Sequence, residues 1–389
     1  MDVYGKGRYT FAVEKCRCEG DDRRVGGSQK LFHPQRLNRA GGKVERLRTG
    51  DGTRDTVTMR DEIAHQPHER LAKHLAADLA AVNDLIRARM ISEHAPRIPE
   101  VTAHLIEAGG KRLRPMLTLA AARLMGYPGP YHIHLAATVE FIHTATLLHD
   151  DVVDGSEKRR GRPTANLLWD NKSSVLVGDY LFARSFQLMT ETGNLEVLSI
   201  LSRAAATIAE GEVLQLTAAT DITTDESVYL KVVRGKTAAL FSAACEVGGV
   251  IADAEAAKVD ALAAYGDAMG IAFQIADDLL DFWGDDGTGK NRGDDFRDRK
   301  LTLPMIKAIA AADADERAFW DRTIAKGRQE PGDLEQALHL MEAHDALEAT
   351  RAEARGWADR AKAALDILPD DPIREMLSDI ADYVVARLN

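Results

Sequence analysis

Apolar residues recur every three or four positions along most of the chain after residue 60. Val82, Leu85 and Ile86, for example, would share one face of a helix, because an α-helix turns once every 3.6 residues. No segment alternates apolar and polar residues for long enough to predict a strand. The pattern therefore predicts an all-α domain, with helices at 63–92, 99–108, 111–125, 131–153, 172–190, 194–218, 225–234, 236–250, 254–283, 301–311, 333–342, 344–366 and 372–387.

The first 59 residues lack this pattern and contain several glycine-rich breaks. Residues 1–60 carry 14 Lys and Arg against 8 Asp and Glu, so the net charge of −11 for the whole chain leaves −17 for the remainder. Cys16 and Cys18 have no second pair of Cys or His at a metal-ligand spacing. We expect 1–59 to be a disordered or mis-started extension. We expect 60–389 to be one domain, in which 284–299 is a loop.

Composition and charge exclude several classes of protein. Of the 389 residues, 45% are hydrophobic and 29% are charged, which is sufficient for a large core. The negative net charge argues against a nucleic-acid partner, since nucleic-acid binders usually present a basic face. No apolar run reaches 18 residues, so no transmembrane segment is predicted. Three cysteines cannot form a disulfide framework, and a cytoplasmic location is therefore expected.

Two clusters of aspartates lie inside apolar helical segments. Both have the pattern D-D-x-x-D, and their members are Asp150, Asp151 and Asp154 in the first and Asp277, Asp278 and Asp281 in the second. On a helix, residues three or four positions apart lie on the same face. Clustered carboxylates in an apolar setting repel one another unless cations are bound, and all-oxygen ligation favours Mg²⁺. The other interpretation, two exposed acidic helix ends, suits a single such string better than a pair on apolar helices.

Further polar and basic residues accompany the clusters. His143 and Gln274 lie on the same helical faces as the aspartates, although either could instead be a satisfied core side chain. Basic residues flank the clusters or follow glycine turns that enter helices, namely Lys111, Arg114, Arg159, Arg160, Lys236, Lys290 and Lys300. Singly, each is more often a solvated surface charge. Together they predict a pocket in which carboxylates hold Mg²⁺, bases bind two polyanionic groups, and apolar helices enclose a hydrophobic remainder.

The order of these motifs resembles that of the trans-isoprenyl diphosphate synthases, the polyprenyl synthetase family, over about residues 65–389. The matching segments are GGKRLRP at 109–115, LLHDDVVD at 147–154, RRGRPTAN at 159–166, GKTAALF at 235–241, FQIADDLLD at 273–281 and GKNRGDDFRDRKLTLP at 289–304. The resemblance implies the isoprenoid synthase fold, in which antiparallel helices surround a deep central cavity, usually in a homodimer. It also implies an Mg²⁺-dependent prenyltransferase that condenses isopentenyl diphosphate onto an allylic diphosphate.

The resemblance also implies a role for each motif residue. Isopentenyl diphosphate would be bound by Lys111, Arg114, His143 and Arg160. The allylic diphosphate would be bound by Arg159, Lys236, Thr237, Gln274, Lys290 and Lys300. The metal would be ligated by Asp150, Asp154 and Asp277, with Asp151, Asp278 and Asp281 as supporting or alternate ligands. The catalytic set is then the six aspartates with Lys236.

Product length in this family depends on the residues four and five positions before the first aspartate. Bulky side chains there close the bottom of the cavity and give short products. Here these residues are Thr146 and Ala145, and both are small. Five residues of helix span about 7.5 Å, so the tunnel would stay open at that depth. The resemblance then predicts an octaprenyl to decaprenyl product of the kind that forms quinone side chains. Phe141, one turn deeper, could also be the floor, and Ala145 could be ordinary helix packing.

Three other functions compete with this interpretation. A short-chain farnesyl or geranylgeranyl synthase would share every catalytic residue and differ only in the floor of the cavity. A terpene cyclase or head-to-head synthase would not need the isopentenyl site at Lys111, Arg114 and Arg160. A non-catalytic subunit would lack part of an aspartate cluster, and this chain lacks none. The hydrophobic polyprenyl product would also allow the enzyme to contact a membrane peripherally when the product is released.

Overall fold

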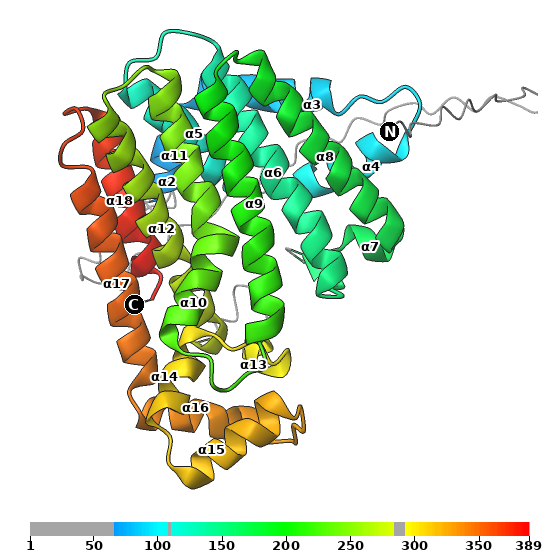
Figure 1. The fold of residues 1–389 in the computed structure, drawn as a ribbon, viewed down its shortest axis with the longest axis vertical. Coiled ribbons are helices and arrows are strands. Elements are labelled where there is room, and N and C mark those ends of the chain that lie inside the picture. The colour runs from blue at the N-terminus through cyan, green and yellow to red at the C-terminus, as the bar shows by residue number, and fades with distance from the viewer. Residues whose placement is uncertain (1–65, 108–109, 160, 284–291, 389) are drawn as a thin grey trace, which may run out of the picture. The chain divides into compact units, whose positions relative to one another are not determined.

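A computed structural model of the chain describes residues 66–107, 110–159, 161–283 and 292–388, which belong to one compact unit (Figure 1). The first helices are α2 (Pro67–His74), α3 (Ala76–Arg89), α4 (Arg97–Glu107), α5 (Leu113–Leu124), α6 (Tyr131–Val153), α7 (Ala165–Leu168), α8 (Asn171–Glu191), α9 (Leu195–Ala218) and α10 (Glu226–Val233). The later helices are α11 (Ala239–Ile251), α12 (Ala256–Trp283), α13 (Asp294–Arg297), α14 (Leu303–Ala311), α15 (Ala314–Trp320), α16 (Asp333–Ala343), α17 (Ala346–Ala364) and α18 (Pro372–Ala386).

Two π-helical segments and two short strands complete the secondary structure of the described residues. Two π-helical segments, η1 (Arg234–Ala238) and η2 (Asp321–Ala325), continue α10 and α15. Strands β1 (Lys158–Arg159) and β2 (Arg162–Pro163) form an antiparallel hairpin in which Lys158 pairs with Pro163. These strands are too short for any alternating pattern to reveal. The predicted all-α class is therefore confirmed, with this hairpin as an addition.

Most predicted helices are found within a few residues of their expected ends, and 131–153 is confirmed at both ends as α6. The helix predicted at 63–92 was wrong as a continuous element. It divides into α2 and α3 at Leu75, whose backbone (φ −98°, ψ 19°) leaves the helical region while its side chain stays buried. The loop predicted at 284–299 contains the short helix α13. The predictions for residues 1–59 lie outside the described part of the chain.

Several helices begin where the sequence supplies a side-chain cap. Asp170, Asn194, Asp225 and Asp371 each accept hydrogen bonds from backbone N–H groups in the first turn of the helix that follows. These N–H groups have no partner within the helix, so a short polar side chain at this position fixes the point at which the helix starts. The N-terminal ends of α8, α9, α10 and α18 are therefore fixed by local sequence and do not depend on tertiary packing.

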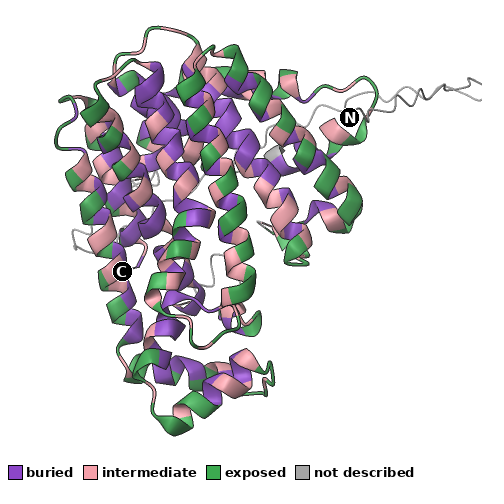
Figure 2. Ribbon diagram, viewed as in Figure 1, coloured by how far each residue is buried: buried purple, intermediate pink, exposed green. Residues whose placement is uncertain are grey.

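The helices α6, α11 and α12 lie at the centre of the core. The helix α11 is buried along most of its length and packs against α5, α9 and α12 (Figure 2). The helix α6 packs against α8, α5 and α3, while α12 is covered on another side by α17. Because α6 and α12 are enclosed in this way, the aspartates near their C-terminal ends are held by rigid elements rather than by loops. No helix among the described residues is long and apolar enough to cross a bilayer.

Candidate active site

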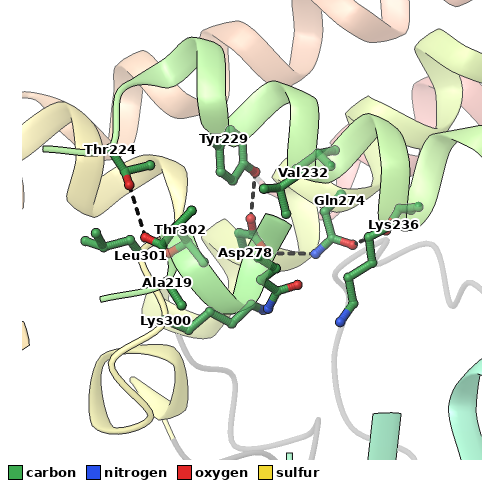
Figure 3. Close-up of a pocket in the computed structure, with 14 residues that line it drawn as sticks. Ala219, Thr224, Tyr229, Val232, Lys236, Gln274, Asp278, Lys300, Leu301 and Thr302 are labelled. Carbon is green, nitrogen blue, oxygen red and sulfur yellow. Dashed lines mark hydrogen bonds between the residues drawn. The ribbon is translucent and has the colours of Figure 1, made fainter. Parts of the chain in front are cut away.

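A pocket of about 520 Å³, including its open mouth, collects most of the residues predicted to bind the allylic diphosphate (Figure 3). Its walls come from the C-terminal end of α9, from α10 and η1, from α12, and from residues 300–302. The lining residues are Gln215, Ala218, Ala219, Thr224, Tyr229, Val232, Val233, Lys236, Thr237, Gln274, Asp278, Lys300, Leu301 and Thr302. Five of the predicted residues, which are Lys236, Thr237, Gln274, Asp278 and Lys300, therefore share one pocket.

A chain of hydrogen bonds crosses this pocket. The hydroxyl of Thr237 donates to Oε1 of Gln274 at 2.8 Å, and Nε2 of Gln274 donates to Oδ1 of Asp278 at 2.8 Å. The other carboxylate oxygen, Oδ2, accepts from the hydroxyl of Tyr229 at 2.6 Å. Burial raises the pKa of Asp278 to about 6, an effect that the nearby charge of Lys300 opposes. Both oxygens of this buried carboxylate are thus engaged by protein donors.

Lys236 is placed by an unusually close approach of two helices. A side chain at Gly211 on α9 would put a Cβ atom 2.6 Å from the backbone nitrogen of Lys236, and one at Gly235 would lie 2.9 Å from Cα of Gly211. The two glycines therefore let η1 touch α9, and the π-helical widening of the turn occurs at this contact. Across it, Nζ of Lys236 donates to Oε2 of Glu212 at 2.7 Å.

The first aspartate cluster lies near the same lysine. Burial raises the pKa of Asp150 to about 7. The positive charge of Lys236 lowers this pKa in part, and the negative charge of Glu212 raises it further. Asp151 is fully buried and forms an ion pair with Arg159, whose Nη2 lies 2.7 Å from Oδ1. Its second oxygen is buried and has no hydrogen-bond partner among the described residues. Asp154 is exposed at the C-terminal end of α6.

The second cluster is tied to the segment that follows it. Oδ2 of Asp281 accepts a hydrogen bond from the backbone N–H of Asp295 at 3.1 Å. Nζ of Lys300 lies 3.3 Å from Oδ1 of Asp295. Burial alone would lower the pKa of Lys300, but the charges of Asp295, Asp278 and Asp277 more than offset this and raise it. The lysine therefore stays charged inside a group of carboxylates.

The segment that follows the second cluster is electrostatically coupled to the first cluster. Burial and the charges of Asp294 and Asp295 raise the pKa of Asp298, and Asp154 from the first cluster acts in the same direction. Carboxylates from α6 and from residues 294–298 are thus near enough to repel each other. The site carries more acidic than basic side chains at this point, which favours the uptake of cations.

The donor set is suited to Mg²⁺, although the aspartates do not form a complete cage. Among the residues that the structure describes, no three Asp, Glu, His or Cys side chains lie close enough together to hold a metal ion. Mg²⁺ usually takes only one or two carboxylates and completes its shell with water and substrate phosphates. The desolvated carboxylate of Asp150 and the unpartnered oxygen of Asp151 are oxygen donors of the required kind.

A second pocket contains the residues predicted to bind isopentenyl diphosphate. It is lined by Gly110, Lys111, Arg112, Leu113, Arg114, Glu140, His143, Phe241 and Phe273. Nη1 of Arg114 lies 3.3 Å from Nε2 of His143, and its guanidinium lies 4.4 Å from the centre of the Phe241 ring. Nζ of Lys111 donates to the hydroxyl of Tyr383 on α18 at 3.1 Å. The structure therefore brings Lys111, Arg114 and His143 together.

The remaining predicted residues are placed differently. Arg160 and Lys290 lie outside the described part of the chain. Phe141 and Ala145 are buried in the apolar core on α6, and Thr146 donates to the backbone oxygen of His143 at 2.8 Å. None of these three lines either pocket described above.

Sequence reasoning missed several residues of the site. Tyr229 and Glu212 lie in none of the recognised motifs. Tyr229 nevertheless forms a hydrogen bond of 2.6 Å with Asp278, and Glu212 forms one of 2.7 Å with Lys236. Asp295 lies in a quoted motif, but it had been assigned no role. Arg112 also lies in a quoted motif without an assigned role, and its guanidinium forms an ion pair with Glu140 at the edge of the second pocket. Hydrogen-bond partners that are distant in sequence leave no local signal.

Comparison with known proteins agrees with this geometry. Residues 95–341 match the model of the polyprenyl synthetase family, and the chain belongs to that family. It is accordingly a prenyltransferase. Enzymes of this family act on allylic and isopentenyl diphosphates and generally use a divalent metal.

Three relatives illustrate the match. The chain is 44% identical to the octaprenyl diphosphate synthase of Escherichia coli over 320 residues, which cover 82% of this chain and 98% of the relative. It is similar to the crystal structure of a decaprenyl diphosphate synthase from Rhodobacter capsulatus, with 72% identity, a TM-score of 0.81, and coverage of 83% and 100%. A polyprenyl synthase from Caulobacter crescentus, crystallised with calcium and isoprenyl diphosphate, has 51% identity, a TM-score of 0.78, and coverage of 82% and 98%.

Proposed function

We propose that this prenyltransferase condenses isopentenyl diphosphate onto an allylic diphosphate with Mg²⁺ and makes an all-trans octaprenyl to decaprenyl diphosphate, the precursor of a quinone side chain. The observation that carries the proposal is the pair of cationic pockets: Lys236 and Lys300 line the first, and Lys111 and Arg114 line the second. Two diphosphates could therefore be bound in separate pockets, the second of which also has Phe241 and Phe273 in its wall. That arrangement suits the joining of two isoprenoid substrates.

The allylic diphosphate would bind where cations meet the aspartates. Lys236 and Lys300 supply positive charge in the first pocket, and Arg159, together with Lys290, would extend it. Asp150, Asp154 and Asp277 would hold the metal, with Asp151, Asp278 and Asp281 in support. Glu212 holds Lys236 before substrate arrives, and a diphosphate oxygen would then compete for the same ammonium group.

Bound Mg²⁺ supplies Lewis-acid stabilisation of the negative charge on a departing diphosphate. Lys236 and Lys300 stabilise that same charge directly, because Glu212 and Asp295 hold them in place before the reaction. The oxygens of Thr237 and Gln274 provide partial negative charge for the allylic carbon as its C–O bond breaks. The apolar helix walls exclude water, which would otherwise capture the cation.

Isopentenyl diphosphate would bind in the second pocket. Lys111 and Arg114 would bind its diphosphate, with Arg160 contributing from the 159–166 motif and His143 donating from α6. The double bond of this substrate would then attack the allylic carbon, while Phe241 and Phe273 line the pocket that holds it. The proton released from the adduct would pass to the departed diphosphate, which is the nearest strong base in this scheme.

The long-chain product rests on the small residues of α6 and on the relatives. Ala145 and Thr146 place no bulky side chain at the depth where short-chain enzymes of the family close the cavity. The names of the Escherichia coli and Rhodobacter capsulatus relatives include octaprenyl and decaprenyl products. A short-chain farnesyl or geranylgeranyl product remains the competing hypothesis, with Phe141 as the floor.

We infer further that the enzyme is a cytoplasmic homodimer that contacts membranes only peripherally, to release its product. Helices α8 and α9 pack against each other and expose several large apolar side chains, which are Val175, Leu176, Phe186, Leu195, Val213 and Leu216. Exposed apolar residues in such number are typical of a surface that a partner covers. A second copy of the chain would bury them.

The proposal is tested by incorporation of labelled isopentenyl diphosphate. Purified protein is incubated with an allylic diphosphate and Mg²⁺, and a parallel sample contains excess EDTA. We expect label in a hydrophobic product only when both the allylic substrate and Mg²⁺ are present. Incorporation that is equal in the EDTA sample would refute the metal assignment, and no incorporation in either would refute the function.

A further inference from the structure

We propose that Tyr229 is a positioning residue of the allylic pocket: its hydroxyl fixes Asp278 and, through Asp278, sets the orientation of Gln274 and Thr237. The inference rests on the proposed function, which assigns this pocket to the allylic diphosphate. Tyr229 has 5% of its surface exposed and Asp278 has 3%, so their 2.6 Å hydrogen bond is sheltered from water. Figure 3 shows the two side chains pointing at each other across the pocket wall.

The direction of each hydrogen bond follows from the groups involved. A carboxylate can only accept, so Tyr229 and Gln274 must both donate to Asp278. The amide of Gln274 then presents its nitrogen to Asp278 and its oxygen to Thr237. The single hydroxyl proton of Thr237 is used in that last bond. Thr237 can therefore offer only lone pairs to a substrate, which suits a developing positive charge better than a phosphate oxygen.

The position of Tyr229 on its helix makes it a rigid anchor. The helix α10 runs directly into η1, and Tyr229, Lys236 and Thr237 from this continuous segment all line the first pocket. Asp225 caps the start of α10, and the helix packs against α9, η1 and α14. The backbone that carries Tyr229 is thus fixed by its neighbours.

Removal of this hydroxyl would leave Oδ2 of Asp278 buried without its donor. A buried acceptor without a partner is costly, so the carboxylate of Asp278 would turn away from its present position. The amide nitrogen of Gln274 would then lose its acceptor, Asp278. The amide could rotate, and its oxygen would no longer be fixed as the acceptor for the hydroxyl of Thr237. Charge stabilisation at the allylic carbon would weaken, while the lysines that bind the diphosphate would be unaffected.

The geometry also separates the roles of adjacent aspartates. Asp278 is buried and has both oxygens engaged by protein donors, whereas its neighbour Asp277 is partly exposed. Asp278 therefore serves as the hydrogen-bond acceptor at the centre of the network. Asp277, which is partly exposed, would be the member of the pair that holds the metal.

The test compares Tyr229→Phe with the matched control Tyr265→Phe. Tyr265 is also fully buried, and its hydroxyl donates one hydrogen bond, to the backbone oxygen of Leu377 at 2.8 Å, outside both pockets. Each variant therefore loses one buried hydroxyl and one hydrogen bond. We expect Tyr229→Phe to lower kcat about tenfold or more and Tyr265→Phe to leave it within about twofold. Both are assayed at a temperature at which thermal unfolding shows them folded.

A binding measurement separates positioning from a general loss of structure. Isothermal titration calorimetry compares an unreactive farnesyl thiodiphosphate with a farnesyl-like ammonium that mimics the allylic cation, the latter with inorganic diphosphate and Mg²⁺. Tyr229→Phe should weaken binding of the ammonium about tenfold and change binding of the thiodiphosphate less than about twofold. Equal weakening of both, or a Tyr229→Phe variant that behaves like Tyr265→Phe, would overturn the inference.

The double variant shows whether Tyr229 acts through Asp278. If it does, adding Tyr229→Phe to Asp278→Asn should lower kcat by no more than about twofold beyond Asp278→Asn alone. A full additional tenfold loss would overturn the inference. Near-normal activity of Asp278→Asn itself would refute the proposed use of the pocket. A strong effect of Asp278→Asn with none of Tyr229→Phe would refute only the role of Tyr229.

Discussion

Replacing Gly211 with alanine should disable the enzyme by displacing the backbone of η1, which carries Lys236. The new Cβ atom would lie 2.6 Å from the backbone nitrogen of Lys236, 2.8 Å from the carbonyl carbon of Gly235 and 3.0 Å from its Cα. Carbon atoms in ordinary contact are about 3.5–4.0 Å apart, so α9 and η1 must separate by roughly 1 Å. All three obstructing atoms belong to the backbone, and no side-chain rotation can relieve the contact.

The expected magnitudes follow from that displacement. Overpacking of this kind lowers the free energy of unfolding by about 1–3 kcal/mol. A shift of about 1 Å in a catalytic group can lower the rate about a hundredfold, and η1 carries Lys236 and Thr237 together. We therefore expect kcat to fall by about that factor in Gly211→Ala, with a smaller loss of stability in thermal unfolding.

The matched control for this substitution is Gly356→Ala. Gly356 lies within α17, and a Cβ atom there would have no heavy atom within 4 Å apart from its own helix and chain neighbours. Alanine should stabilise this helix by about 0.5–1 kcal/mol and leave kcat unchanged. A folded Gly211→Ala enzyme with kcat within about threefold of the parent would refute the reasoning from the α9–η1 contact.

Three further predictions concern the metal, the second pocket and the product. Asp150→Ala should lower kcat at least about a hundredfold, because a metal ligand is lost, while circular dichroism stays unchanged; near-normal turnover would remove Asp150 from the metal site. Lys111→Ala should raise the KM for isopentenyl diphosphate about tenfold or more in steady-state kinetics, since a charge-assisted bond is lost, and an unchanged KM would contradict its assignment. Ala145→Phe should shorten the product in mass analysis, because a bulky ring would close the tunnel, and an unchanged length would refute the open-tunnel argument.

Much of the fold could be predicted from hydrophobic periodicity. The helix α6 was predicted at both of its ends, because the Pro/Gly break at 127–130 precedes it and its apolar stretch ends at Val153. The helix α15 was missed, although its capping box, Asp313 with Glu316, is a readable signal in the sequence. The split at Leu75 could not be predicted, because this residue is apolar and in phase with the helices on both sides of it.

The site was predictable only where residues fall in compact motifs. Asp278, Gln274 and Thr237 were found in this way, and the structure brings them into one pocket. Tyr229 and Glu212 were not, since each acts on a residue at least 24 positions away and the contact exists only after the helices pack. The ion pair between Asp151 and Arg159 is similarly a product of folding, because β1 turns the chain back over α6.

The measurement that most directly tests the central claim is the length of the product. Purified protein is incubated with Mg²⁺, farnesyl diphosphate and labelled isopentenyl diphosphate, and the chains are dephosphorylated and sized by mass spectrometry. We predict all-trans chains of eight to ten isoprene units, consistent with an open tunnel past Ala145. Products that stop at geranylgeranyl length would contradict the account.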